Sequence, residues 1–321
     1  MRREITKFII HLAALMLGVV IMDFAVGKTG QWLLKRLPDY GDRLITKPNF
    51  ALNRVTADIL IVGSSRADHH YVPLQLKDSI EKYSHKDFSI YNAGQHNQGF
   101  NYFLCVIESA LQRHTPKVII LDVENLSLID SETFQTKALR PYIDINPIVK
   151  SELSKVKGKE ALFLKSNLYD FNGQLLQIVL NTTDKSTDSN SLYGYAPLLE
   201  TFDARTYGGE KALSYDFKTN INPMPKEDFE RIISLCHNKD IRLIVCISPN
   251  YGLQEHNNMS YITIHSLCQK NNVPFIDMEN DKFFDTKPYL FYDPNHLNSR
   301  GAVIFTSQFF AKAKPFLTDI K

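Results

Sequence analysis

Two short segments, far apart in the chain, together contain the residue types that acyl transfer requires. The segment GSSR (63–66) follows a run of apolar residues, and the segment YDPNHLNSRG (292–301) contains Asp293 and His296. A serine hydroxyl is a weak nucleophile until a base removes its proton, and an imidazole base must be held in the right tautomer by a third group. The segments therefore predict a nucleophile at Ser64 or Ser65, with a histidine and a carboxylate to activate it.

The elements that must position these residues follow an α/β pattern. Short apolar runs rich in β-branched residues predict strands at 58–63, 88–92, 117–123, 241–247 and 274–278. Helices are predicted at 100–113, from 225 onward, at 260–270 and at 299–314. Strands that alternate with helices indicate a parallel sheet covered on both faces, and such sheets bind ligands at the carboxyl ends of their strands. GSSR, NAGQHNQG (92–99) and Glu124-Asn125 each follow a predicted strand.

The order of the motifs separates two families of serine hydrolase. Gly63-x-Ser65-x-Ala67 differs by one residue from the G-x-S-x-G motif of α/β-hydrolases, but that fold normally places many residues between its acid and its histidine. A G-x-S after the first strand and a D-x-x-H ahead of the final helix instead resemble the SGNH (GDSL-like) hydrolase superfamily. The resemblance covers residues 57–125 and 225–316, and it implies a flavodoxin-like three-layer sandwich that hydrolyses or transfers acyl groups.

The resemblance also implies a role for individual residues. Ser65, the third residue of G-x-S, matches the nucleophile, while His296 matches the base and Asp293 the orienting acid. The second oxyanion donor of the family is a glycine N–H five residues after an asparagine, a position that Asn97 occupies here, with Gly94 as the nearest glycine. Asparagine tolerates positive φ better than most residues. Asn125 matches the asparagine of the family's G-x-N-D block, although the glycine and the aspartate are missing.

The remaining polar residues near these motifs have simpler interpretations. Ser64 is expected to cap a helix or lie in a turn, Arg66 to bind an anionic substrate group or form a surface ion pair, and Asn298 to cap the final helix. Asp68, His69 and His70 resemble metal ligands, but no matching ligand spacing occurs elsewhere, so an exposed helix start is expected. His96 is expected to line the pocket or to be a solvated loop residue. No metal and no cofactor are expected.

The N-terminus predicts a membrane anchor. Residues 8–26 are nearly all apolar, close to the length that crosses a bilayer, and Arg2, Arg3 and Lys7 precede them. By the positive-inside rule the N-terminus stays in the cytoplasm, and the rest of the chain lies outside. A core helix is the alternative, because His11 and Asp23 interrupt the run. The four cysteines lie in apolar segments and are expected to be buried thiols, and the net charge of +2 argues against a nucleic-acid partner.

The predicted organisation has three parts. Residues 1–26 form the cytoplasmic tip and signal-anchor, 27–56 a juxtamembrane connector, and 57–316 the SGNH-like domain with an insertion at about 126–224. The polar stretch 182–191 is expected to be a mobile loop. With an anchor ahead of it, the chain resembles extracytoplasmic SGNH-like proteins of bacterial envelope polysaccharide acylation, such as the D-alanyl transfer protein and the alginate O-acetylation proteins. That likeness implies an inner-membrane protein with a periplasmic catalytic domain.

Two functions follow, from different classes. The first is a serine esterase or O-acyltransferase that acts on an acylated carbohydrate or envelope glycan, with a possible membrane acyl-transfer partner. The second is a catalytically inactive SGNH-like scaffold or glycan-binding component of a polysaccharide assembly system, which the altered oxyanion segments keep open. A phospholipid or lipoyl esterase with the same three residues is a further alternative.

Overall fold

A parallel sheet organises the larger part of the chain. The computed structural model describes residues 2–37, 46–129, 136–183, 192–203, 221–251 and 258–320. Within them, five parallel strands pair in the order β2-β1-β3-β4-β5, which is the flavodoxin-like order. The strands are β1 (Ile59–Gly63), β2 (Ile90–Asn92), β3 (Val118–Asp122), β4 (Arg242–Ile247) and β5 (Phe275–Asp277). The predicted sheet is therefore confirmed, and each strand ends within two residues of its predicted bounds.

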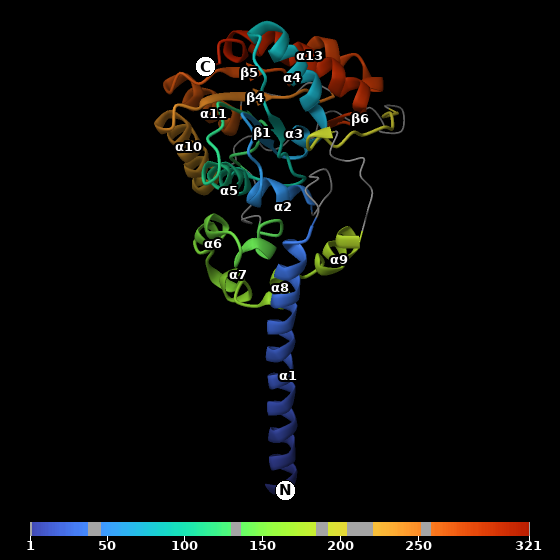
Figure 1. Cartoon of the computed structure of the whole chain (residues 1–321), viewed down its shortest axis with the longest axis vertical. Coiled ribbons are helices and arrows are strands. Elements are labelled where there is room, and N and C mark those ends of the chain that lie inside the picture. The colour runs from blue at the N-terminus through green and yellow to red at the C-terminus, as the bar shows by residue number, and fades with distance from the viewer. Residues whose placement is uncertain are drawn as a thin grey trace. The chain divides into compact units, whose positions relative to one another are not determined.

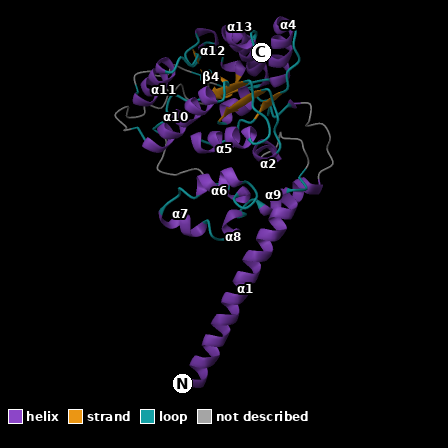
Figure 2. Cartoon of the chain, turned by 60° about the vertical axis from the view of Figure 1, so that its left-hand side comes forward, coloured by secondary structure: helices purple, strands orange, loops and turns teal. Residues whose placement is uncertain are grey.

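Helices cover both faces of this sheet, so its central strands are buried throughout (Figures 1 and 2). On one face, α4 (Pro73–Ser84) packs against α13 (Ser299–Leu317). On the other, α5 (Phe100–Leu111) contacts both α2 (Thr46–Asn53) and α10 (Pro223–Asn238). The remaining elements of this part are α3 (Ser65–His70), α11 (Met259–Lys270), α12 (Lys282–Asp285), η3 (Pro288–Leu290), and the antiparallel pair β6 (Phe291–Asp293) and β7 (His296–Leu297). This is the three-layer α/β sandwich that the sequence predicts.

Some local expectations were wrong. The final helix does not stop before Pro315 but continues to Leu317, whose side chain is buried in the core. A proline in the last turn removes one backbone hydrogen bond, and packing of the helix end outweighs that loss. Helix α2 lies in the segment that was expected to be a connector, and α4 was not predicted. The expectation of buried thiols is confirmed for all four cysteines.

The chain divides into two compact units, residues 1–38 with 136–185, and residues 39–135 with 186–321. The smaller unit contains α1 (Arg2–Leu34), η1 (Arg140–Tyr142), α6 (Pro147–Leu153), α7 (Gly158–Phe163), α8 (Asn167–Asp170) and α9 (Leu175–Thr183). The expected insertion thus contributes to both units, and the domain boundaries drawn from the sequence stay a prediction. Of the expected loop 182–191, the first two residues end α9 and the others lie outside the described residues.

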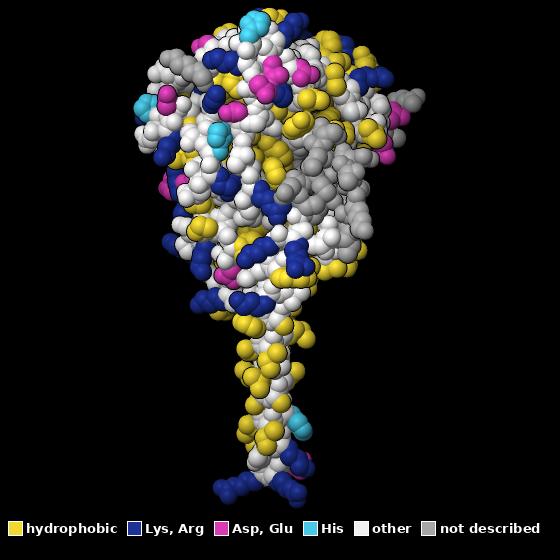
Figure 3. Space-filling model, in the orientation of Figure 1, with side chains coloured by type: hydrophobic (Ala, Val, Ile, Leu, Met, Phe, Trp, Pro, Cys, Tyr) yellow, Lys and Arg dark blue, Asp and Glu magenta, His cyan; other side chains and the backbone are white. Residues whose placement is uncertain are grey.

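The C-terminal part of helix α1 is hydrogen-bonded to the start of α8, and its apolar side chains are exposed along the rest of its length. The Asp23 carboxylate accepts hydrogen bonds from Ser166 Oγ at 2.6 Å and from the Leu168 N–H at 2.9 Å, at the start of α8. Toward the N-terminus, the apolar side chains from Ile5 to Phe24 are exposed, with Lys and Arg gathered at the tip (Figure 3). Among the described residues, α1 is the helix long and apolar enough to cross a membrane.

Candidate active site

The serine segment lies where β1 turns into α3. A Cβ on Gly63 would come within 2.7 Å of the Asp122 carbonyl oxygen, so the close approach of β1 to β3 requires glycine at this position. Ser64 is the N-cap residue of α3, as expected, although its side chain makes no capping hydrogen bond. Ser65 is the first residue of α3, at the carboxyl end of the sheet's central region. The turn therefore places one serine at the helix start and the next one within the first turn.

Ser65, His296 and Asp293 form one hydrogen-bonded chain. His296 Nε2 lies 2.7 Å from Ser65 Oγ, and His296 Nδ1 lies 2.9 and 2.8 Å from the two carboxylate oxygens of Asp293. Because Nδ1–H donates to the carboxylate, the lone pair of Nε2 faces the serine hydroxyl. Burial alone raises the pKa of Asp293, but its hydrogen bonds with His296 and the Asn295 and His296 N–H groups hold the pKa below its usual value. The acid is therefore ionised at neutral pH.

A buried histidine connects the serine helix to the segment that carries His296. His70 Nδ1 lies 2.9 Å from Ser248 Oγ, after β4, and His70 Nε2 accepts a hydrogen bond from the Leu297 N–H at 2.9 Å. Ser248 in turn donates to Asp122 Oδ1 at 3.3 Å. Burial holds the pKa of His70 well below its usual value, so the ring is neutral and Nδ1 carries the proton. His70 thus fixes β7 relative to α3.

Arg66 also stabilises α3, and the expectation of a surface ion pair was wrong because the side chain is buried, while anion binding stays a prediction. Its guanidinium is buried and donates to the carbonyl oxygens of Ser248 and Val123 at 3.0 and 3.1 Å. It also contacts Asn250 Oδ1 at 3.0 Å and Glu279 Oε1 at 3.4 Å. Desolvation lowers the pKa of Arg66, but neighbouring carboxylates raise it above its usual value overall. Arg66 therefore joins α3 to the segments that follow β3, β4 and β5.

The candidate oxyanion residues lie in the segments that follow β2 and β3, the two strands that flank β1. Asn97 follows β2 and has φ of 53°, the left-handed conformation that asparagine tolerates. Asn125 follows β3 and is buried. Gly94 has a different role, since its N–H donates to Asn92 Oδ1 at 2.9 Å and a Cβ there would lie 2.5 Å from the Asp68 nitrogen. Gly94 lets α3 approach β2, so Asn97 is the better candidate for the second donor.

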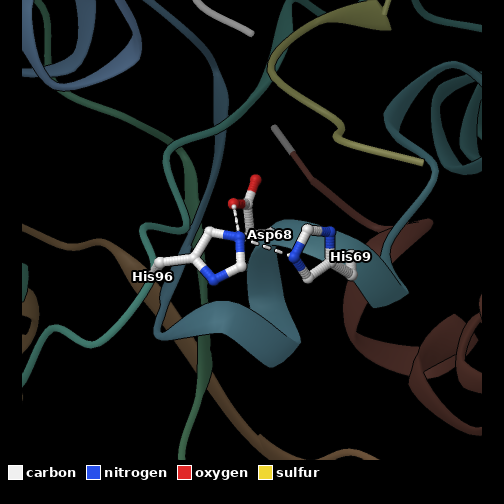
Figure 4. A group of neighbouring side chains, drawn as sticks. All are labelled: Asp68, His69 and His96. Carbon is white, nitrogen blue, oxygen red and sulfur yellow. Dashed lines mark hydrogen bonds and ion pairs between the residues drawn. The ribbon is translucent and has the colours of Figure 1, made fainter. Parts of the chain in front are cut away.

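A polar cluster beside these residues was not predicted. Asp68 and His69, on α3, meet His96 from the segment after β2 (Figure 4). His69 Nε2 lies 2.7 Å from His96 Nε2, which lies 3.4 Å from Asp68 Oδ2. Lys47, on α2, pairs with Asp68 and donates to the Gly194 carbonyl oxygen. The expectation of an exposed helix start was wrong, because Asp68, His69 and His70 are all buried.

The same cluster is, within the described part of the chain, a group of side chains whose type would suit a metal ion. One donor atom from each of Asp68, His69 and His96 lies within 4.8 Å of the others. However, Lys47 pairs with the Asp68 carboxylate, and the two Nε2 atoms share a hydrogen bond. A cation would have to displace both interactions. We therefore interpret the cluster as a hydrogen-bond network, and the absence of a metal or cofactor from the reaction stays a prediction.

Comparison with known proteins gives distant likenesses to solved structures. No protein-family model and no curated protein matches the chain. An acetyl xylan esterase, AlAXEase, is 13% identical, with 79% of this chain and 98% of that chain covered and a TM-score of 0.39. A Parabacteroides merdae protein described as a GDSL-like lipase is 11% identical, covering 84% and 99%, with a TM-score of 0.39. A Bacteroides fragilis protein described as an acylhydrolase is 10% identical, covering 81% and 87%, with a TM-score of 0.35.

Proposed function

We propose that this chain is a membrane-anchored serine esterase or O-acyltransferase of the SGNH (GDSL-like) type. The observation that carries the proposal is the continuous chain Ser65–His296–Asp293, with both hydrogen bonds at or below 2.9 Å. The three residues lie at the carboxyl edge of a flavodoxin-like parallel sheet, where such folds bind their ligands. The proposal is supported by the sequence motifs and by the geometry of the site, and not by the distant likenesses to solved structures.

The reaction follows from the hydrogen bonds. As Ser65 Oγ attacks the acyl carbonyl carbon, His296 Nε2 accepts its proton, and the Asp293 carboxylate stabilises the resulting imidazolium. The N–H groups of Ser65 and Asn97 and the side chain of Asn125 would stabilise the oxyanion. The imidazolium then protonates the departing alcohol oxygen, leaving an acyl ester on Ser65. In the second half, His296 takes a proton from water or from an acceptor hydroxyl, whose oxygen attacks the acyl carbon. The bond between the acyl carbon and Ser65 Oγ then breaks, and His296 returns the proton to that oxygen.

The proposal also covers the substrate and the location of the protein. The substrate is an acylated carbohydrate or envelope glycan, and a membrane partner supplies or receives the acyl group in the transfer reaction. Helix α1 crosses the bacterial inner membrane once, with its basic tip in the cytoplasm and the sheet domain in the periplasm. The bare apolar length of α1 and the Lys and Arg residues at its N-terminal end support this orientation. A periplasmic reporter fused to the C-terminus should be active, and activity of a cytoplasmic reporter instead would contradict it.

Labelling with a fluorophosphonate probe tests the chemistry. The full chain in membranes should take up the probe, Ser65→Ala should abolish labelling, and Ser64→Ala should retain it, because the N-cap serine is the matched control. Labelling should coincide with hydrolysis of a simple acetyl ester. A wild-type protein that neither labels nor hydrolyses acetyl esters would favour the inactive scaffold. Loss of labelling in Ser64→Ala alone would show that the wrong serine was chosen.

A further inference from the structure

The hydrogen bonds around His96 determine which of its nitrogens carries the proton. His69 Nδ1 lies 2.6 Å from the Ala196 carbonyl oxygen, which only accepts, so Nδ1 of His69 is protonated. Burial lowers the pKa of His69 to about 4, and the ring is therefore neutral with a lone pair on Nε2. His96 Nε2, 2.7 Å away, must then donate its hydrogen to that lone pair. In neutral His96 the other nitrogen, Nδ1, is left as an acceptor.

His96 stays neutral and lies at the active site. Burial lowers the pKa of His96, and the nearby His296 and Lys47 lower it further, against the opposing effect of Asp68. The ring centroid of His296 lies 6.4 Å from that of His96 and 5.5 Å from that of His69. The His96 side chain is 47% exposed, whereas Asp68 is 5% exposed. The network thus presents one partly exposed histidine next to the base.

The unprotonated nitrogen of His96 is directed outward from this network. Figure 4 shows that the second ring nitrogen of His96 points away from Asp68 and His69. A neutral imidazole nitrogen held in this way accepts a hydrogen bond from a hydroxyl or an amide N–H and offers nothing to a bare hydrocarbon. His296 must reach the alcohol oxygen of an ester, and the ring centroids of His96 and His296 are 6.4 Å apart, so His96 would be within reach of a sugar-sized alcohol part of the substrate.

We propose that His96 Nδ1 accepts a hydrogen bond from a hydroxyl group on the alcohol part of the substrate, and that this contact selects esters of sugars or polyols. The proposal rests on the proposed function. In transfer, the same contact binds the acceptor alcohol, because the leaving and entering alcohols occupy one position. His69 and Asp68 are positioning residues that fix the tautomer and ring orientation of His96, and Lys47 holds Asp68.

Matched acetyl esters test the proposal in the full chain. Glycerol monoacetate and mono-O-acetylglucose have hydroxyls on the alcohol part, whereas ethyl acetate and p-nitrophenyl acetate have none. His96→Phe keeps a ring of similar size and removes the acceptor, so kcat/KM for the two hydroxylated esters should fall by roughly 3- to 10-fold, the value of one hydrogen bond. The two plain esters have no hydroxyl to make this contact, so their kcat/KM should fall less, and the ratio of kcat/KM between hydroxylated and plain esters should drop.

Two further variants separate positioning from packing. His69→Phe removes the acceptor that orients His96 Nε2–H, so it should reduce the same preference for hydroxylated esters over plain ones. His114→Phe is the matched control, because His114 is also a partly exposed histidine beside a carboxylate, Asp58, and should leave all four esters unchanged.

Each other outcome overturns the inference in a recognisable way. An equal loss on all four esters in His96→Phe would show a general effect on the reaction, and no loss on any would show a solvated loop histidine. A wild type that cleaves the plain esters without preferring the hydroxylated ones would reject His96 selection and leave the proposed serine chemistry standing. A wild type that cleaves no ester and takes up no fluorophosphonate would reject both proposals.

Discussion

Replacing His70 with phenylalanine should separate the acid–base segment from the serine helix while it preserves the volume of the core. In the native protein, the His70 ring bridges Ser248 Oγ and the Leu297 N–H, both at 2.9 Å, and Leu297 directly follows the proposed base His296. Phenylalanine fills the same space but can neither accept from the Leu297 N–H nor donate to Ser248. The segment that contains His296 would lose its fixed distance from α3.

The two lost hydrogen bonds determine how much the free energy of unfolding should fall in His70→Phe. Leu297 is fully buried, so its orphaned N–H should cost about 1–3 kcal/mol, and the bond to Ser248 contributes about 1 kcal/mol more. The free energy of unfolding should therefore fall by about 2–4 kcal/mol. The rate should fall further than stability explains, because a displacement of about 1 Å in a catalytic group can reduce the rate on the order of 100-fold.

The assay combines denaturant unfolding with hydrolysis of p-nitrophenyl acetate, with kcat/KM expressed per folded molecule. Ile232→Ala is the control, since Ile232 is fully buried in α10 and its truncation should cost a comparable 2–5 kcal/mol, as is typical of core isoleucines. His70→Phe should lose activity per folded molecule, and Ile232→Ala should not. Equal activity per folded molecule in the two variants would refute the positioning role of His70.

Three other changes give further expected outcomes. Asp293→Asn should lower kcat by about 10⁴-fold with little change in KM, as measured with the same ester, because the amide no longer fixes the proton on His296 Nδ1. Gly94→Ala should lower the free energy of unfolding by about 1–3 kcal/mol in urea titrations, since the new Cβ would lie 2.5 Å from the Asp68 nitrogen. Burial lowers the pKa of His69 from 6.5 to about 4, so its neutral form stabilises the fold above pH 6.5, and this contribution is lost as the pH falls toward 4. The loss should reach roughly 3 kcal/mol, and His69→Gln should flatten the pH dependence of unfolding.

The fold was predictable because its main strands and helices have clear apolar patterns in the sequence. The strands β1 and β3 are buried along their whole length, and continuous apolar runs are the pattern that parallel strands require. Ser65 and His296 could be paired from the sequence because a G-x-S after the first strand and a D-x-x-H ahead of the final helix together resemble the motif order of one hydrolase superfamily. The short helix α2 gave no such signal, because its buried side chains mix the polar Lys47, which pairs with Asp68, with the apolar Ala51 and Leu52.

The misassigned residues share one cause. Arg66 and His70 belong to a six-residue helix, α3, whose sequence is almost entirely polar. The local sequence alone therefore predicts an exposed helix. Their hydrogen-bond partners, Ser248 and Leu297, lie far along the chain, and nothing within 65–70 indicates them. Burial of polar side chains depends on partners that only the folded chain brings together, and periodicity contains no information about those partners.

The polar character of α3 also explains how the proposed nucleophile can be positioned. Apolar contacts position a helix through the fit of its side chains, because dispersion contacts have no preferred direction. Arg66 and His70 instead make directional hydrogen bonds, so a small shift of α3 would break several of them at once. The bond from His70 to Leu297 extends this constraint to the segment that contains His296. The polar residues whose burial was not predicted from the sequence therefore constrain the positions of Ser65 and His296 relative to each other.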